Sequence, residues 1–417
     1  MSRWPARVLL ALALPGLAAM LAGCDTVGYY AQSIGGHLGL MAESRPLPDA
    51  IAAAREAKDT RLAQRLALAG TIRDFASKAL KLPDNGSYRR YANLHRPYVV
   101  WSVFATPELS MELHKWCFLV VGCISYRGYY DQADADRYAE GLRKDGLEPY
   151  VAGIPAYSTL GYFDDPLLNT FVYQPEGELA RLIFHELAHQ VVYVRNDTTF
   201  NESFATAVET AGVERWLALA ASPEARASYR QYDLRRQQFR AMLLETRDRL
   251  DALYRSALAD DAKRAGKAAI FAGLRAQYAR LKVEWGGYSG YDRWFEKPLT
   301  NAQLAAVATY QQWVPAFTAL LARNGGDWTA FYAAARRIGD LPRAERDARL
   351  RELAPPATRG EPIQAGEGGG GAAGGAVPGA ARASGAPDMP TAQNAPAAPA
   401  TSATSAITSA PAPAARP

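Results

Sequence analysis

Residues 185–189 read HELAH, two histidines four residues apart with a glutamate directly after the first. On a helix, His185 and His189 lie on one face, so both can bind one zinc ion through ring nitrogens about 2.0–2.1 Å from the metal. Glu186 lies about 100° round the helix from His185, where it can take the proton of an attacking water as a general base. The alternative is an amphipathic helix that carries two histidines by chance. Because the chain has only five histidines, that pattern is rare by chance, and we favour the zinc site.

A third zinc ligand is expected in the sequence NESFA, at residues 201–205. Glu202 lies thirteen residues after His189, in the first turn of the next expected helix. The connecting chain spans roughly 3.3 Å per residue when extended, so it can return to the metal. The alternative is a helix N-terminal charge stabilised by the macrodipole, but beside HELAH we favour the ligand. Glu209, on the same helical face, is expected to hydrogen-bond a metal-binding histidine.

Two tyrosines downstream of these helices could assist the chemistry. A metallopeptidase needs a hydrogen-bond donor for the oxyanion besides the metal. Tyr288 and Tyr291, in the sequence GGYSGYDRWF, are candidates on a segment that reads as a loop. The alternative is that both rings pack against Trp285 and Trp294. Both interpretations stay open.

Two aspartates precede the expected zinc helix in the sequence GYFDDP. Asp164 and Asp165 could bind the amine of a substrate, or they could initiate a turn before Pro166, and we favour the turn. The other histidines share no partner motif and are not expected to take part in the site: His37, His95 and His114.

The N-terminus has the layout of an export signal. Two arginines are followed by an apolar run over residues 8–21, which is too short for a comfortable membrane span. The run ends in Leu-Ala-Gly-Cys, which resembles the bacterial lipoprotein signal, so residues 1–23 would be removed and Cys24 lipidated. The alternative is an ordinary cleaved signal that leaves a free cysteine. Several acyl chains would hold the protein on a bilayer, facing the periplasm. Asp25 resembles the signal for staying at the inner membrane.

The charge balance argues against nucleic acid as a partner. The chain has 47 basic and 42 acidic side chains, a formal charge of +5. Arg3 and Arg7 belong to the expected signal, so the mature chain is nearly balanced. Such a balance provides no electrostatic footprint for nucleic acid.

The remaining cysteines, Cys117 and Cys123, lie in the sequence KWCFLVVGC. In an oxidising compartment an isolated pair this close predicts a short-loop disulfide, against the alternative of two buried thiols. The spacing is not CxxC and no second pair exists, so a cysteine zinc site is not expected.

The pattern along the chain predicts an α+β protein that is predominantly helical. Helical spacing of apolar residues covers 49–80, and strand-like sequence covers 98–106 and parts of 149–174. These segments form a small sheet ahead of the HExxH helix. From 223 to 284 the chain reads as helix folded back on itself.

Composition divides the chain into four segments. Residues 1–23 are the expected signal peptide, and 24–46 the lipidated N-terminus and tether. Residues 47–354 form the expected catalytic domain. Residues 355–417 contain Ala, Pro, Gly, Ser and Thr with no aromatic residue, so they are expected to be disordered.

HELAHQ, followed by NESFA and a further glutamate, resembles the gluzincin metallopeptidases, especially the zinc aminopeptidases. The blocks CFLVVGC, AYSTLGYFDDP and GYDRWF extend the resemblance to the bacterial putative aminopeptidase family over roughly residues 25–350. The resemblance implies a zincin-like fold, one Zn²⁺ per chain and a peptide substrate. It also implies His185, His189 and Glu202 as ligands and Glu186 as base.

Three functions remain open from the sequence. The first is an aminopeptidase that hydrolyses peptides with metal-activated water and a glutamate base. The second is an envelope endopeptidase with the same chemistry, because the sequence lacks a GAMEN-like block for a free amine. The third is a non-catalytic lipoprotein that keeps zinc as a structural element.

Overall fold

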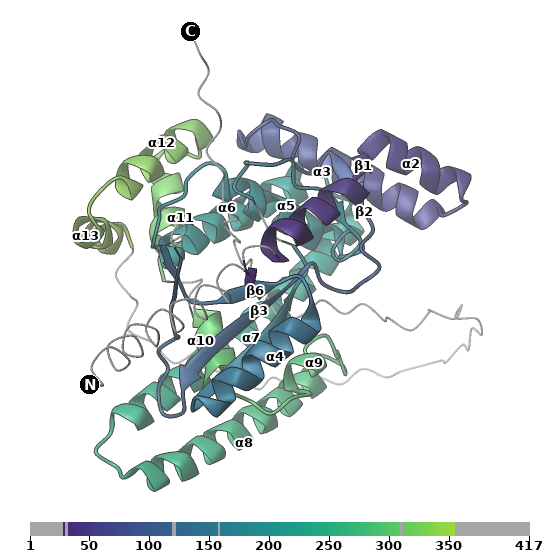
Figure 1. Ribbon diagram of the computed structural model, residues 1–417. Coiled ribbons are helices and arrows are strands. Elements are labelled where there is room, and N and C mark those ends of the chain that lie inside the picture. The colour runs from purple at the N-terminus through teal and green to yellow at the C-terminus, as the bar shows by residue number, and fades with distance from the viewer. Residues whose placement is uncertain (1–27, 30–31, 119–121, 157–158, 309–311, 355–417) are drawn as a thin grey trace, which may run out of the picture.

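The structure is a computed structural model, and it describes most of the chain between residues 28 and 354 (Figure 1). The described residues are 28–29, 32–118, 122–156, 159–308 and 312–354. The expected signal peptide, the expected lipidation of Cys24 and the tail over 355–417 that is expected to be disordered fall outside them. Within these residues the chain is mostly helical with three small sheets, which confirms the α+β prediction.

The largest structural β unit is a three-stranded antiparallel sheet. Strand β3 (Val100–Pro107) pairs on one side with β6 (Arg127–Tyr129) and on the other with β7 (Leu147–Ile154). Helix α4 (Gln132–Lys144) packs against this sheet through small and apolar side chains such as Ala139. Because β3 is buried along most of its length, its sequence is mostly apolar and does not alternate between apolar and polar residues.

Two smaller sheets complete the β structure. In one, β2 (Arg90–Ala92) lies between β1 (Arg45–Pro46) and β8 (Leu167–Leu168). In the other, the hairpin of β4 (Trp116–Phe118) and β5 (Gly122–Ile124) is closed by a disulfide between Cys117 and Cys123, as predicted. In the described part of the chain, every strand precedes the HELAH helix, as expected.

The helical segment expected over 49–80 is two helices, α2 (Leu47–Glu56) and α3 (Thr60–Leu80). The break falls where Lys58 adopts φ of 59°, a left-handed conformation that no helix interior accepts. Asp59 then caps α3 by accepting a hydrogen bond from the Leu62 amide at 2.9 Å. Neither glycine nor proline marks the break in the sequence, so the pattern did not reveal it.

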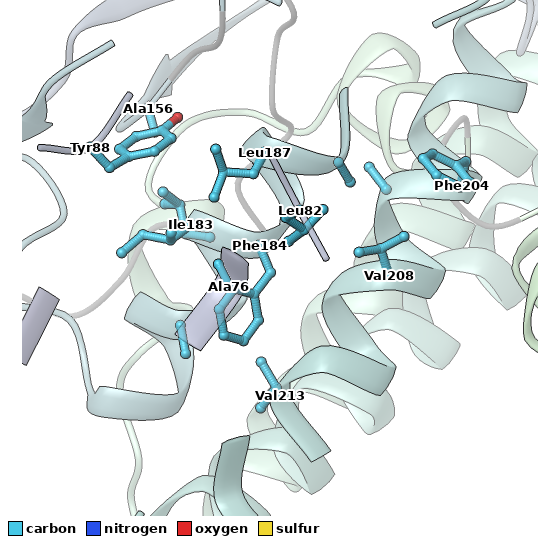
Figure 2. Packing of buried hydrophobic residues seen from close by; sticks show 14 of the residues in the cluster. Ala76, Leu82, Tyr88, Ala156, Ile183, Phe184, Leu187, Phe204, Val208 and Val213 are labelled. Atoms are coloured by element: carbon cyan, nitrogen blue, oxygen red, sulfur yellow. The ribbon is translucent and has the colours of Figure 1, made fainter. Parts of the chain in front are cut away.

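Helices α5 (Glu176–His189) and α6 (Thr198–Leu219) form the centre of the molecule. Nearly every side chain of α5 is buried, so polar groups along it must find partners inside the protein. Gly212 of α6 allows a close approach, because a Cβ there would lie 2.9 Å from Phe184 of α5. Figure 2 shows Phe184 and Ile183 of α5 among buried side chains that include Phe204 and Val208 of α6.

The C-terminal half is helical, and its long stretch folds back as predicted. Helix α7 (Pro223–Arg255) packs against α8 (Asp260–Glu284) around a second apolar cluster that contains Phe239. Five shorter helices follow: α9 (Asp292–Phe295), α10 (Asn301–Ala308), α11 (Val314–Arg323), α12 (Trp328–Gly339) and α13 (Arg343–Leu353).

Asp197 connects the start of α6 to α13, and we expect its removal to destabilise the whole fold. One carboxylate oxygen caps α6 by accepting from the Phe200 amide at 3.1 Å, and the other lies 2.7 Å from Arg346 Nη2. Asp197→Ala leaves a buried guanidinium unpaired and should cost about 2–4 kcal/mol of unfolding free energy. Urea denaturation measures this cost.

Asp347→Ala provides the matched control, because that carboxylate forms only a surface contact of 3.9 Å with Arg343. It should change the unfolding free energy by less than about 0.5 kcal/mol. Equal effects of the two substitutions would contradict the structural role of Asp197.

Candidate metal centre

Local hydrogen bonds around Asn201 bring the two site helices together. After α5 ends at His189, the chain turns through Asn196, which adopts φ of 61°. The Asn201 side chain accepts from the Val194 amide at 2.7 Å and donates to the Val194 carbonyl at 2.8 Å. This closes the connection and sets the first turn of α6, with Glu202, beside the last turn of α5.

His185, His189 and Glu202 converge on one buried point. The two histidine Nε2 atoms lie 3.1 Å apart, and the Glu202 oxygens lie 3.3 Å from His185 Nε2 and 3.8 Å from His189 Nε2. Tetrahedral zinc at about 2.0–2.1 Å from each ligand separates neighbouring ligand atoms by roughly 3.3 Å. The three residues are at most 4% exposed. Two imidazoles and one carboxylate at these separations fit a zinc ion with a further position for water.

Glu209 orients the first histidine of the motif. Its Oε2 lies 2.8 Å from His185 Nδ1, so the nitrogen that faces away from the site has a carboxylate partner and Nε2 is directed to the metal position. Burial opposes the negative charge of Glu209 and the positive charge of His185. Even so, Arg181 and His185 lower the pKa of Glu209 to about 2, and Glu209 with Glu202 raises the pKa of His185 to about 10 in the metal-free arrangement.

A buried ionic ladder continues from Glu209 to helix α7. Arg181 donates from Nη1 to both oxygens of Glu209, at 2.9 and 3.0 Å, and from Nε to Glu178 at 2.9 Å. Glu178 in turn lies 3.4 Å from Arg236 Nη1 on α7. Burial opposes the charge of Arg181, but Glu178 and Glu209 outweigh it and raise its pKa. Sequence reasoning missed this ladder, although Glu178, Arg181 and His185 share one helical face.

Glu186 is fully buried beside two further polar side chains. Burial, followed by the charges of Glu186 and Asp165, raises the pKa of Tyr88. Tyr88 is 1% exposed and adopts φ of 61°, and its hydroxyl has no hydrogen-bond partner among the described residues. A left-handed tyrosine with an unpartnered buried hydroxyl is costly, and such costs collect at functional sites. Figure 2 shows its ring beside Ile183 and Leu187 of the HELAH helix.

The two aspartates of GYFDDP have different environments. Asp164 is exposed, whereas Asp165 is 2% exposed and accepts hydrogen bonds from the Thr159 amide and hydroxyl at 2.8 and 3.0 Å. Asp165 therefore closes the loop over residues 159–165, in keeping with the turn interpretation. Burial raises its pKa to about 7, and the nearby charge of Glu186 adds to that rise against the bonds from Thr159.

Tyr288 and Tyr291 pack in the second apolar cluster, the one that contains Phe239 of α7. The candidate metal ligands lie on other helices, α5 and α6. Tyr291 is 2% exposed and stacks on Phe239, with ring centroids 3.9 Å apart. Tyr288 lies under the Arg235 guanidinium at 4.4 Å. Both rings also contact Trp285, as the packing alternative anticipated. Their assignment as oxyanion donors stays a prediction.

We expect Arg181→Gln to weaken zinc binding, because the substitution removes the charge that holds Glu209 against His185. Loss of such a supporting interaction reduces metal affinity by about 10–100-fold. Competition with a chromogenic chelator measures the affinity. Arg215→Gln, at an exposed position of the same pair of helices, is the control and should bind zinc as the wild type does. Unchanged affinity in Arg181→Gln would contradict the ladder's role.

Asp165 should make the protein less stable as the pH rises from about 4 to about 7. Its pKa is raised to about 7 in the folded state and is about 4 when unfolded, so folding favours the protonated carboxyl. Between these pH values the unfolding free energy of the wild type should fall by on the order of 2–4 kcal/mol relative to that of Asp165→Asn. Chemical denaturation across this range tests it, with Asp164→Asn as the matched control. Parallel pH profiles for wild type and Asp165→Asn would refute the raised pKa.

Comparison with known proteins provides one match. A family model described as putative aminopeptidase matches residues 28–350, which include the site residues on α5 and α6 and most of the described fold. No curated protein and no solved structure matches the chain. The match covers well over half of the sequence. The chain belongs to the putative aminopeptidase family.

Proposed function

We propose that the protein is a zinc-dependent aminopeptidase that hydrolyses peptides from their free N-terminus. The observation that carries the proposal is the separation of the His185, His189 and Glu202 ligand atoms, which suits tetrahedral zinc. Glu186 follows His185 in the same buried helix, and the proposal assigns its carboxylate the role of general base. The family match supports a peptide substrate at the coarse level.

The chain's own residues divide the work between binding and proton transfer. Bound zinc would supply Lewis-acid polarisation of the scissile carbonyl and of the attacking water. Glu186 takes the proton of the attacking water and returns it to the departing amine. Glu209 holds the His185 ring in one orientation, and Arg181 holds Glu209. Burial of all these groups excludes competing water and strengthens each electrostatic contact.

The site would act at a membrane surface. We propose that Cys24 carries the lipid anchor and that the domain faces the periplasm, with Asp25 favouring the inner membrane. In the part of the chain that the structure describes, no helix is long and apolar enough to cross a membrane.

Hydrolysis of a peptide library by wild type and Glu186→Gln, with bound zinc measured on both, tests the function. Removal of the general base should lower kcat by about 10²–10⁴-fold while zinc content is retained, because the substitution leaves all three ligands in place. Glu214→Gln, an exposed glutamate of α6, should retain full activity. Mass spectrometry of the products should show residues lost only from free N-termini.

Other outcomes would select the other functions. Internal cleavage, or cleavage of N-terminally blocked peptides, would indicate an endopeptidase with the same chemistry. If the zinc-loaded wild type cleaves no peptide, the remaining function is that of a non-catalytic binding lipoprotein whose zinc is structural. Full zinc occupancy in Glu202→Ala would show that the third ligand is wrong.

A further inference from the structure

The segment expected as a tether contains a helix over residues 32–43 with an apolar exposed face. Ile34 and Leu38, one turn apart, are 44% and 59% exposed. The same face also carries Gly35, Gly39 and Ala42, and the exposed Glu43 lies at its edge in the last turn of the helix. Surface helices of soluble proteins normally present polar residues on this face.

The opposite face holds the helix firmly on the domain. Gln32 donates to the Gly128 carbonyl at 3.2 Å and accepts from the Tyr130 amide at 3.1 Å, at the end of β6. Gly36 lies so close to the Tyr130 ring that a Cβ would come within 2.2 Å of it. The orientation of the helix is therefore determined by packing, and its apolar face is presented outward.

A neighbouring loop extends the apolar face. Tyr162 and Phe163, in the loop over residues 159–165, are 64% and 40% exposed. Phe163 contacts His37 of the helix, with ring centroids 4.4 Å apart. The helix and the loop together carry half of the large apolar side chains that are exposed in the described part of the chain. Such clustering marks an interaction surface.

The length of the chain that precedes this surface identifies what covers it. Eight residue-to-residue steps separate Cys24 from Gln32, the first residue of the described helical segment over 32–43. Fully extended, they span at most about 26 Å. A lipid anchor at Cys24 therefore confines the surface to the immediate neighbourhood of the bilayer, and it makes docking effectively intramolecular, so a small apolar surface is sufficient. Tyrosine and phenylalanine beside aliphatic side chains suit the membrane–water interface.

We propose that the docking face, defined by Ile34, Leu38, Tyr162 and Phe163, rests on the lipid bilayer and orients the active site toward the membrane surface. The proposal rests on the lipid anchor that forms part of the proposed function. Its occupant is the bilayer rather than a second copy of the chain.

Docking of this face would restrict the substrates of the site. The loop that carries Tyr162 also carries Asp165, which lies within electrostatic range of Glu186. It packs against the end of α5 as well, since a Cβ on Gly161 would lie 3.2 Å from Gln190. The face and the catalytic helix therefore share one loop. We infer that the preferred substrates are peptides whose N-termini lie close to the bilayer.

Nitroxide labels on the full-length lipidated protein test the docking. Leu38→Cys and Tyr162→Cys each supply one free thiol, because Cys117 and Cys123 are joined in a disulfide. In vesicles of phosphatidylethanolamine and phosphatidylglycerol, both labels should collide with oxygen more often, and with a water-soluble nickel chelate less often, than a label at Val283→Cys. Val283 is 79% exposed on α8 and provides the matched control.

Each alternative result has a distinct meaning, and none depends on catalysis. Failure of the wild type to float with vesicles would refute both the anchor and the docking face. Flotation with nickel accessibility at 38 and 162 equal to that at 283 would refute the docking face alone. Spin–spin coupling between molecules at position 38, without oxygen accessibility, would reassign the face to contacts between copies.

A peptidase assay adds a functional result. At equal concentration, a peptide tethered to the vesicle surface should be cleaved about tenfold faster than the same peptide free in solution. The double variant Leu38→Glu with Tyr162→Glu should lose this preference and retain activity on the free peptide, whereas Val283→Glu should keep both. A preference that persists in the double variant would contradict the role of the docking face. Absence of any cleavage would count against the peptidase function, while the label accessibilities would still decide the docking.

Discussion

The contact between His185 and Glu209 is the interaction on which the rest of the site depends. A carboxylate inside a protein is stable only with a charged or hydrogen-bonding partner. Arg181 provides that partner for Glu209, and Glu178 and Arg236 extend the balance to α7. The geometry of the candidate metal centre is thus coupled to the packing of three helices.

This arrangement explains why helix α5 is both polar in sequence and buried in the structure. Leu179, Ile183 and Leu187 face the apolar core, while Glu178, Arg181 and His185 face the ladder. The apolar contacts supply the stability, and the ionic groups supply orientation at a cost in desolvation. A rigid helix on a packed core is the kind of support that a metal site requires, because small displacements of a ligand weaken metal binding.

The polar residues whose electrostatics involve Glu186 are held in a different way. Tyr88, Thr159 and Asp165 come from two loops, joined by a hydrogen bond of 2.6 Å from the Tyr88 amide to the Asp165 carbonyl. The 159–165 loop also carries Tyr162 and Phe163 at the surface. The candidate metal ligands are therefore carried by helices, whereas Asp165 is carried by a loop that belongs to the proposed membrane-facing surface. A loop of this kind can couple the position of the protein on the bilayer to the access of substrates to the site.

The sequence by itself predicted the candidate metal ligands and the proposed general base, and it determined the disulfide and the largely helical character, because each depends on residue identity or on short-range periodicity. HELAH specifies a helical face through its spacing alone. The tertiary structure decided how Glu202 returns to His185, which partners hold Glu209, and where Tyr88, Tyr288 and Tyr291 lie. It also decided that α2 and α3 are separate and that residues 32–43 present an apolar face outward. These features depend on contacts between segments far apart in the chain, and local patterns carry no information about such contacts.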